Sequence, residues 1–261
     1  MAEGLIALPV LGTLTWLVLL GGWTNPVRRL DLRPTGSVIL LGVLSVAAAV
    51  YFFGPIGGAA LVVSVMVHEF GHVAAFRVAG HEDATFRLIP LMGGVAISRR
   101  LPATQLHDFY ITIMGPGICL VLMVAATVID RAVEAHWWAL SEFFWMLAAV
   151  TGALNFFNLL PLWPLDGGRI VRILTYTLSP RLAHGVTLAM SAALAVLALA
   201  SQSVLLFFFA LISAQSAMSA PQLAARQRAL SAGQAVMGLA AYLAMLGAFG
   251  LGGWAILVRF V

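Results

Sequence analysis

The sequence predicts an all-α polytopic membrane protein with about eight transmembrane helices. Hydrophobic residues make up 62% of its 261 positions and charged residues only 9%, whereas about a quarter of the residues in a soluble domain are charged. Apolar stretches of about 20 residues, the length that crosses a bilayer, recur along the whole chain. The composition therefore excludes a large soluble domain and predicts that the lipid bilayer surrounds most of the chain.

Eight apolar segments are expected to form the membrane helices. They cover roughly residues 5–23, 37–53, 57–79, 108–130, 143–160, 184–200, 203–220 and 233–257. The first segment lacks the basic flank of a cleaved signal peptide, so we expect it to be retained as a helix. The sixth and seventh have a second interpretation as one long bent helix, because only residues 201–203 separate them.

The positions of the arginines predict the orientation in the membrane. The chain has no lysine, and most of its arginines lie in the connections 24–36, 80–107, 161–183 and 221–232, with Arg131 and Arg259 among the exceptions. Along an eight-helix path these connections lie on one side of the membrane, which the positive-inside rule makes cytoplasmic, with both termini outside. This arrangement explains the net charge of +4 without a nucleic-acid partner.

The third apolar segment contains the polar motif HEFGH, residues 68–72. Ionisable side chains are rare in hydrocarbon and are usually functional there. On a helix His68 and His72 share one face, so both imidazoles can bind one tetrahedral metal ion, with Glu69 as the general base. The small Gly71 is expected to leave room for metal, water and a substrate backbone. The alternative is that both histidines are core residues bonded to neighbouring helices.

A catalytic zinc site needs a third protein ligand, and Asp166 is the favoured candidate. Ahead of it, Pro161 and Pro164 break the fifth helix, and after it Gly167 and Gly168 free the backbone to turn. A broken helix at membrane depth is tolerated where it lines a polar cavity. The alternative is that Asp166 caps the following helix. The less favoured candidates lie in predicted connections or at solvated helix ends: His81, His107, His136, His184, Asp108 and Asp130.

The two motifs together carry a family resemblance. HEFGH is followed about 90 residues later by N-x-x-P-x-x-x-L-D-G, which begins at Asn158 and includes Asp166. This pair resembles the site-2 protease family of intramembrane zinc metalloproteases over roughly residues 57–180. The resemblance implies that His68, His72 and Asp166 bind one zinc ion per chain and that Glu69 is the catalytic base.

The same resemblance implies that Asn158 helps to hold the substrate or the developing oxyanion, a charge that polar donors stabilise. Asn155, one turn earlier, could share this role or could instead tie helices together. FRLIPLMGGVAIS, residues 86–98, resembles the short membrane-associated β-hairpin of this family, with a turn expected at Gly93-Gly94. Such a strand can pair with an extended substrate segment. MGPGIC, residues 114–119, resembles a further family motif, although Cys119 stands where asparagine is usual.

The expected organisation has three parts. Residues 1–56 form two N-terminal helices, residues 57–180 the catalytic core, and residues 181–261 the C-terminal helices. The 131–142 connection is too short for a domain. We therefore expect a compact form of the family, without a PDZ-like or nucleotide-sensing domain. Substrate selection then falls to the membrane region, the short loops or a membrane regulatory partner.

The predicted function is regulated intramembrane proteolysis of transmembrane protein substrates, with Glu69 activating a zinc-bound water. The predicted location is a bacterial or archaeal cell membrane, with the active site toward the cytoplasm. One alternative is a metal transporter, for which we would expect ligands along a route and repeated halves. The other alternative is a non-catalytic membrane scaffold, which predicts loss of the base or of a ligand, yet all of these residues are present.

Overall fold

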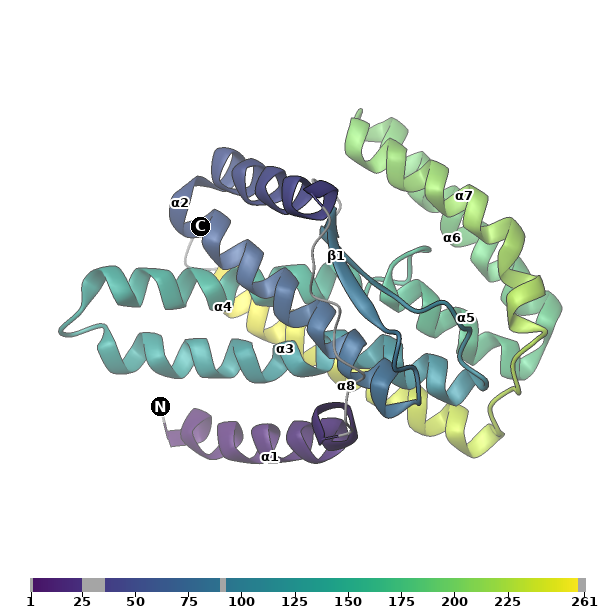
Figure 1. The fold of residues 1–261 in the computed structure, drawn as a ribbon, viewed down its shortest axis with the longest axis horizontal. Coiled ribbons are helices and arrows are strands. Elements are labelled where there is room, and N and C mark those ends of the chain that lie inside the picture. The colour runs from purple at the N-terminus through teal and green to yellow at the C-terminus, as the bar shows by residue number, and fades with distance from the viewer. Residues whose placement is uncertain (1, 25–35, 90–92, 258–261) are drawn as a thin grey trace. The chain divides into compact units, whose positions relative to one another are not determined.

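The computed structural model describes residues 2–24, 36–89 and 93–257 and is almost entirely helical (Figure 1). The described helices are α1 (Ala2–Thr24), α2 (Gly36–Val78), α3 (Gln105–Val133), α4 (Trp138–Asn158), α5 (Asp166–Leu178), α6 (Pro180–Ala200), α7 (Val204–Ala224) and α8 (Ala232–Leu257). The described strands are β1 (Thr85–Ile89) and β2 (Gly93–Ile97). Each expected apolar segment falls on a helix, and the second and third share α2, which bends at Gly54, where φ is 71°.

The predicted class, a mainly helical membrane protein, is confirmed. Five of the described helices are long and apolar enough to cross a bilayer: Ile39–Val78, Gln105–Val133, Trp138–Asn158, Pro180–Ala200 and Ala232–Trp254. The apolar parts of α1 and α7 are shorter, Gly4–Leu20 and Leu206–Met218. Eight spans therefore stay a prediction. The orientation in the membrane also stays a prediction, and three of the arginines on which it depends, Arg28, Arg29 and Arg33, lie outside the described residues.

Residues 184–220 form two helices rather than one bent helix. Helix α6 ends at Ala200 and α7 begins at Val204, with Gln202 between them at a φ of 50°. The two helices pack against each other. The connection between α3 and α4 is also short, because α3 ends at Val133 and α4 begins at Trp138.

The chain divides into two compact units. The first comprises Met1–Arg100, Met114–Asn155 and Ala248–Val261, and the second Leu101–Ile113 and Phe156–Gly247. The first unit therefore contains the HEFGH motif, and the second contains the whole of α5, α6 and α7. The three-part functional division at residues 56 and 180 stays a prediction.

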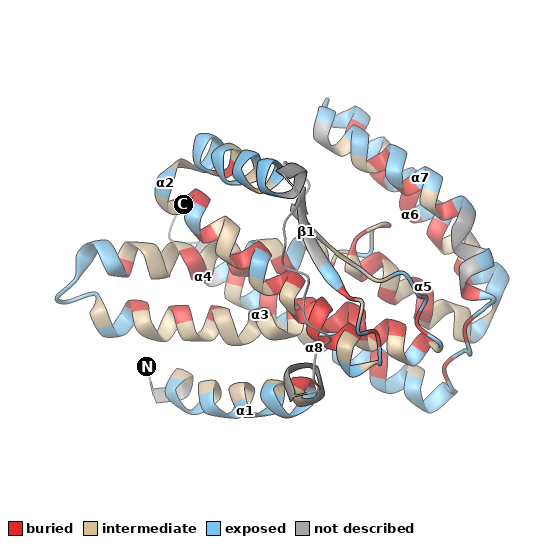
Figure 2. Cartoon of the chain, in the orientation of Figure 1, coloured by how far each residue is buried: buried red, intermediate tan, exposed pale blue. Residues whose placement is uncertain are grey.

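In the first unit, two polar contacts join the second half of α2 to α4. The hydroxyls of Ser64 and Thr151 lie 2.7 Å apart, and one turn further along both helices His68 meets Asn155. The two helices therefore run in the same direction, as expected for the third and fifth spans of an alternating path. All four residues are buried, and Figure 2 shows how buried residues gather on this half of α2.

The two strands pair as an antiparallel sheet. They lie in the expected region 86–98, except that β1 begins one residue earlier, at Thr85. Arg87 is opposite Val95, and Leu88 is opposite Gly94. The expected turn at Gly93-Gly94 is wrong, because both glycines belong to β2 and pair with β1. The sheet contacts α2 in the first unit. Its association with the membrane stays a prediction.

The base of the two-stranded sheet is held by side chains beyond the end of α2. The hydroxyl of Ser98 lies 2.8 Å from Nδ1 of His81 and donates to Oδ1 of Asp83 at 3.2 Å. The N–H of Arg99 donates to Oδ2 of Asp83 at 2.7 Å. These bonds join the residue after β2 to the chain that enters β1.

Candidate metal centre

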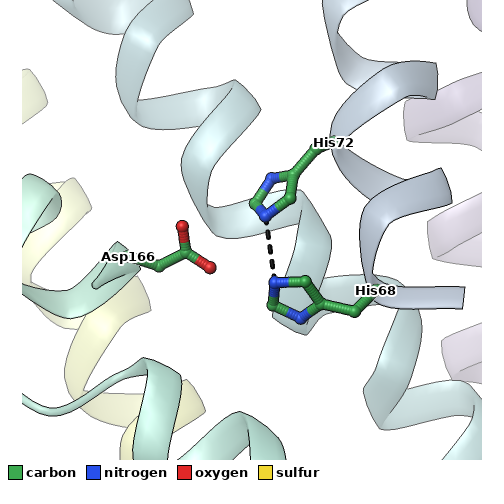
Figure 3. A group of neighbouring side chains, drawn as sticks. All are labelled: His68, His72 and Asp166. Atoms are coloured by element: carbon green, nitrogen blue, oxygen red, sulfur yellow. Dashed lines mark hydrogen bonds between the residues drawn. The ribbon is translucent and has the colours of Figure 1, made fainter. Parts of the chain in front are cut away.

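The two histidines of HEFGH lie one turn apart on α2, as the sequence predicts. Their side chains converge, with Nε2 of His68 3.0 Å from Nε2 of His72 (Figure 3). The rings meet edge to face, with centroids 4.7 Å apart. Both residues are buried, at 4% and 8% exposure. A helix within the first unit thus presents two converging imidazole nitrogens from buried residues.

Asn155 of α4 determines which nitrogen of His68 carries the proton. Its Oδ1 lies 2.8 Å from Nδ1 of His68, and its Nδ2 donates to the carbonyl of Thr151 at 2.8 Å. Because Oδ1 can only accept, Nδ1 of His68 must donate, which leaves Nε2 with a lone pair. A metal-binding histidine is commonly held in this way through its other ring nitrogen.

This contact supports one of the two roles considered for Asn155, the tie between helices. Both ends of its amide already have a partner, and the residue is completely buried. It therefore ties α2 to α4 and orients His68, and its part at the oxyanion stays a prediction. The sequence signal was an asparagine in an apolar helix, but its partner was not identified from the sequence.

Two glycines bring α2 and α3 close together at the histidines. A Cβ on Gly71 would lie 2.3 Å from the carbonyl oxygen of Met114, and one on Gly115 would lie 2.4 Å from Nε2 of His72. The expected role of Gly71, leaving room for metal and substrate, is therefore wrong, because the α3 backbone occupies that side. The structure places Gly115 directly against the His72 ring.

The donor set of the two histidines fits zinc. A tetrahedral zinc ion with Zn–N bonds of about 2.0–2.1 Å holds two nitrogens about 3.3 Å apart, and the observed Nε2 atoms are 3.0 Å apart. The two imidazole rings therefore need to move only slightly further apart to bind the ion. Glu69, the next residue after His68, is buried at 6% exposure, which keeps this carboxylate away from bulk water.

Asp166 belongs to the second unit, where it is the first residue of α5. Leu165, not Asp166, occupies the N-cap position, so the alternative role as an N-cap is wrong. The turn from Leu159 to Leu165 follows the end of α4 ahead of Pro161, as predicted. Asp166 is half-buried, and so is Asn158, the last residue of α4.

Gly167 and Gly168 allow this turn to pack on the start of α5. A Cβ on Gly167 would lie 2.1 Å from the carbonyl oxygen of Leu159, and one on Gly168 would lie 2.4 Å from that of Leu162. Both glycines are helical residues of α5. Their role is therefore close approach of the backbone and not, as expected, freedom to turn.

Two carboxylates expected at solvated helix ends are in fact buried. Asp108 forms ion pairs with Arg169 and Arg172 of α5 and accepts from Nε2 of Gln227 at 3.3 Å. Asp130 accepts from the hydroxyl of Ser141 at 2.5 Å. These partners explain why both carboxylates can leave water. They also give the two residues structural roles.

The structure thus brings together His68, His72 and Asn155 within one unit. His68, His72 and Asp166 each offer one atom that can bind a metal ion, and Figure 3 draws these three side chains. Asp166 and Asn158 belong to the other unit, and their roles at the two histidines are taken up below as proposals.

Comparisons with known proteins agree with these observations. Residues 127–200 match the family model of peptidase family M50, a range that contains Asn158 and Asp166. The chain is 37% identical over 128 residues to the putative zinc metalloprotease Rip3 of Mycobacterium tuberculosis, covering 48% of this chain and 32% of that protein. It is 31% identical over 116 residues to a zinc metalloprotease of Methanocaldococcus jannaschii, covering 43% and 32%.

A solved structure, the site-2 protease from Methanocaldococcus jannaschii, aligns with 75% of this chain and 89% of its own, at a TM-score of 0.45 and 23% identity. The family-model match and the curated relatives confirm the resemblance to the zinc metalloproteases of peptidase family M50. The matched regions span about a third of the length of the curated relatives.

Proposed function

We propose that this protein is an intramembrane zinc metalloprotease that hydrolyses peptide bonds in or near transmembrane segments of other membrane proteins. The observation that carries the proposal is the buried pair of histidines, whose Nε2 atoms lie 3.0 Å apart while Asn155 holds His68 through its other ring nitrogen. Two histidines oriented in this way suit a metal ion better than a core contact. The similarity to zinc metalloproteases supports the choice of zinc.

In the proposed site His68, His72 and Asp166 hold one zinc ion per chain. When bound, zinc lowers the pKa of a coordinated water toward 7 and polarises a carbonyl. Glu69 accepts the proton of the attacking water and then donates a proton to the leaving amine. Asn158 offers its amide N–H to the substrate carbonyl oxygen as negative charge develops there. Asn155 keeps His68 in the tautomer that leaves Nε2 available.

The proposed substrate is a transmembrane protein, such as a membrane-tethered regulator or a remnant peptide. A helix in the bilayer satisfies its own backbone hydrogen bonds, so the segment to be cleaved must first be extended. The edges of the β1–β2 sheet offer backbone donors and acceptors for strand addition. A membrane regulatory partner is a further candidate for selecting substrates.

The proposed location is a bacterial or archaeal cell membrane, with the active site toward the cytoplasmic side. The arginine distribution supports this orientation under the positive-inside rule. The shared direction of α2 and α4 agrees with the alternating path on which it depends.

Metal analysis of detergent-purified protein tests the proposed ligand set. We expect about one zinc ion per wild-type chain. Asp166→Ala and His68→Ala should each weaken zinc binding strongly, because each removes one of three protein ligands. Glu82→Ala, which removes an exposed carboxylate, is the matched control and should keep its zinc. Full zinc affinity in Asp166→Ala would exclude Asp166 as a ligand.

A further inference from the structure

The turn between α4 and α5 contains backbone carbonyl groups in buried residues. Outside a helix, these carbonyls need hydrogen-bond donors from other parts of the chain. The last carbonyls of any helix lack intrahelical donors, and buried carbonyls almost always find a partner. Here Leu159 and Leu160 donate backbone N–H groups to the carbonyls of Phe156 and Phe157, and Leu165 donates to that of Leu162. Two further carbonyls in the turn, those of Leu159 and Trp163, accept from side chains of distant helices.

The first of these side chains is Tyr242 of α8. Its hydroxyl donates to the carbonyl of Leu159 at 2.7 Å. Tyr242 is 4% exposed and Leu159 is completely buried, so water does not readily replace the phenol. Leu159 directly follows Asn158, the last residue of α4. The Tyr242 hydroxyl therefore holds the point at which the chain leaves the helix.

The second is Ser213 of α7. Its hydroxyl donates to the carbonyl of Trp163 at 2.7 Å, and Ser213 is completely buried. The indole N–H of Trp163 in turn donates to the hydroxyl of Ser216 on the same helix at 2.6 Å. The guanidinium of Arg172 lies over the indole, 5.1 Å from its centroid. Trp163 is three residues before Asp166, so these contacts hold the turn at its other end.

We propose that Tyr242 and Ser213 are positioning residues for the metal ligand Asp166 and for Asn158. The inference rests on the proposed function, since it takes Asp166 to be a zinc ligand. The two hydroxyls act on the backbone at both ends of the turn, and Gly167 and Gly168 then pack that turn onto α5. The placement of Asp166 depends on this turn, because α5 begins at Asp166 without a side-chain cap.

Zinc affinity, measured by competition with a chelator in detergent, tests the proposal without a substrate. Tyr242→Phe and Ser213→Ala each remove one hydroxyl and leave one buried carbonyl without its donor. Loss of a group that orients a metal ligand typically lowers metal affinity about 10–100-fold, and we expect about tenfold for each variant. The matched controls are Tyr51→Phe and Ser45→Ala, whose hydroxyls are exposed on α2 and whose zinc affinity should equal that of the wild type.

Combination with Asp166→Ala separates positioning from general destabilisation. If Tyr242 acts through Asp166, Tyr242→Phe should lower zinc affinity in the wild type but have no further effect in the Asp166→Ala background. The same holds for Ser213→Ala, which provides a separate test if one variant fails to fold. Thermal unfolding of the metal-free proteins shows how far each variant is destabilised.

The outcomes distinguish this inference from the proposed function. If Asp166→Ala lowers zinc affinity while Tyr242→Phe and Ser213→Ala lower only the unfolding temperature, the positioning role is overturned and the metal site stands. If Asp166→Ala leaves zinc affinity unchanged, the proposed ligand set is overturned and this inference with it. Equal losses from Tyr242→Phe with and without Asp166 would also contradict the positioning role.

Discussion

Nδ1 of His68 on α2 donates a hydrogen bond to Oδ1 of Asn155 on α4 across 2.8 Å. This one contact selects the tautomer of His68 and fixes the rotation of its ring. Both effects leave Nε2 directed toward Nε2 of His72. An asparagine in an apolar helix therefore orients the imidazole of His68, the proposed metal ligand, on another helix.

Replacement of Asn155 should weaken zinc binding. Asn155→Ala removes the acceptor for Nδ1–H, and we expect zinc affinity to fall about 10–100-fold. Asn155→Asp keeps an acceptor oxygen and should retain more of the affinity than Asn155→Ala. Chelator competition measures both. Equal affinity of Asn155→Ala and wild type would show that this hydrogen bond does not prepare the ligand.

Gly115→Ala should disturb the site through His72. The added methyl group would lie 2.4 Å from the imidazole, so the ring must move, and overpacking of this kind destabilises by about 1–3 kcal/mol. We expect weaker zinc binding together with a lower unfolding temperature. Gly12→Ala on α1, whose methyl group would meet no atom within 4 Å, is the control. Unchanged zinc affinity in Gly115→Ala would contradict this close approach.

Acid should weaken the base of the β1–β2 sheet through Asp83. The N–H of Arg99 and the Ser98 hydroxyl bond to its carboxylate and lower the pKa of Asp83. Because the folded pKa lies below the unfolded value of about 3.9, this stabilisation is present above pH 3.9 and is lost as pH falls through the folded pKa. Asp83→Asn should therefore unfold at a lower temperature than wild type at pH 6, with a difference that narrows below about pH 4. A difference in unfolding temperature that does not change with pH would contradict this role of Asp83.

Proline along β2 tests whether the sheet presents the substrate. Val95 and Ile97 direct their N–H groups to one side of the strand and Ala96 to the other. The N–H groups on one side bond to β1, and those on the other side point to the free edge of the two-stranded sheet. We expect that proline at the open edge impairs cleavage of an intact transmembrane helix in proteoliposomes without loss of zinc. Substrates that contain helix-breaking residues should be cut faster than leucine-rich helices. Full activity of Val95→Pro, Ala96→Pro and Ile97→Pro alike would exclude the β1–β2 sheet from substrate presentation.

Local sequence patterns predicted the helices well. Each expected apolar run falls on a helix, and Pro161 correctly placed the end of α4, because length, hydropathy and proline act locally. The i, i+4 spacing likewise predicted that His68 and His72 converge, since helical geometry alone brings them together.

Contacts between distant segments could not be predicted in this way. His68 and Asn155 are 87 positions apart, and their contact depends on the rotation of two helices about their axes. Asp108 was expected in solvent because its partners, Arg169 and Arg172, are remote in the sequence. The Gly93-Gly94 signal was misleading because glycine is compatible with a strand as well as with a turn.

The most direct test of the account is Glu69→Gln, assayed in parallel for zinc and for proteolysis of a model transmembrane substrate. The substitution keeps the size of the side chain but removes the base, while His68, His72 and Asp166 remain. We predict about one zinc ion per chain, as in wild type, and a cleavage rate at least about 100-fold lower. Glu82→Gln, the same change at an exposed position, should retain wild-type cleavage. A Glu69→Gln protein that binds zinc and cleaves the substrate at the wild-type rate would contradict the proposed catalytic mechanism.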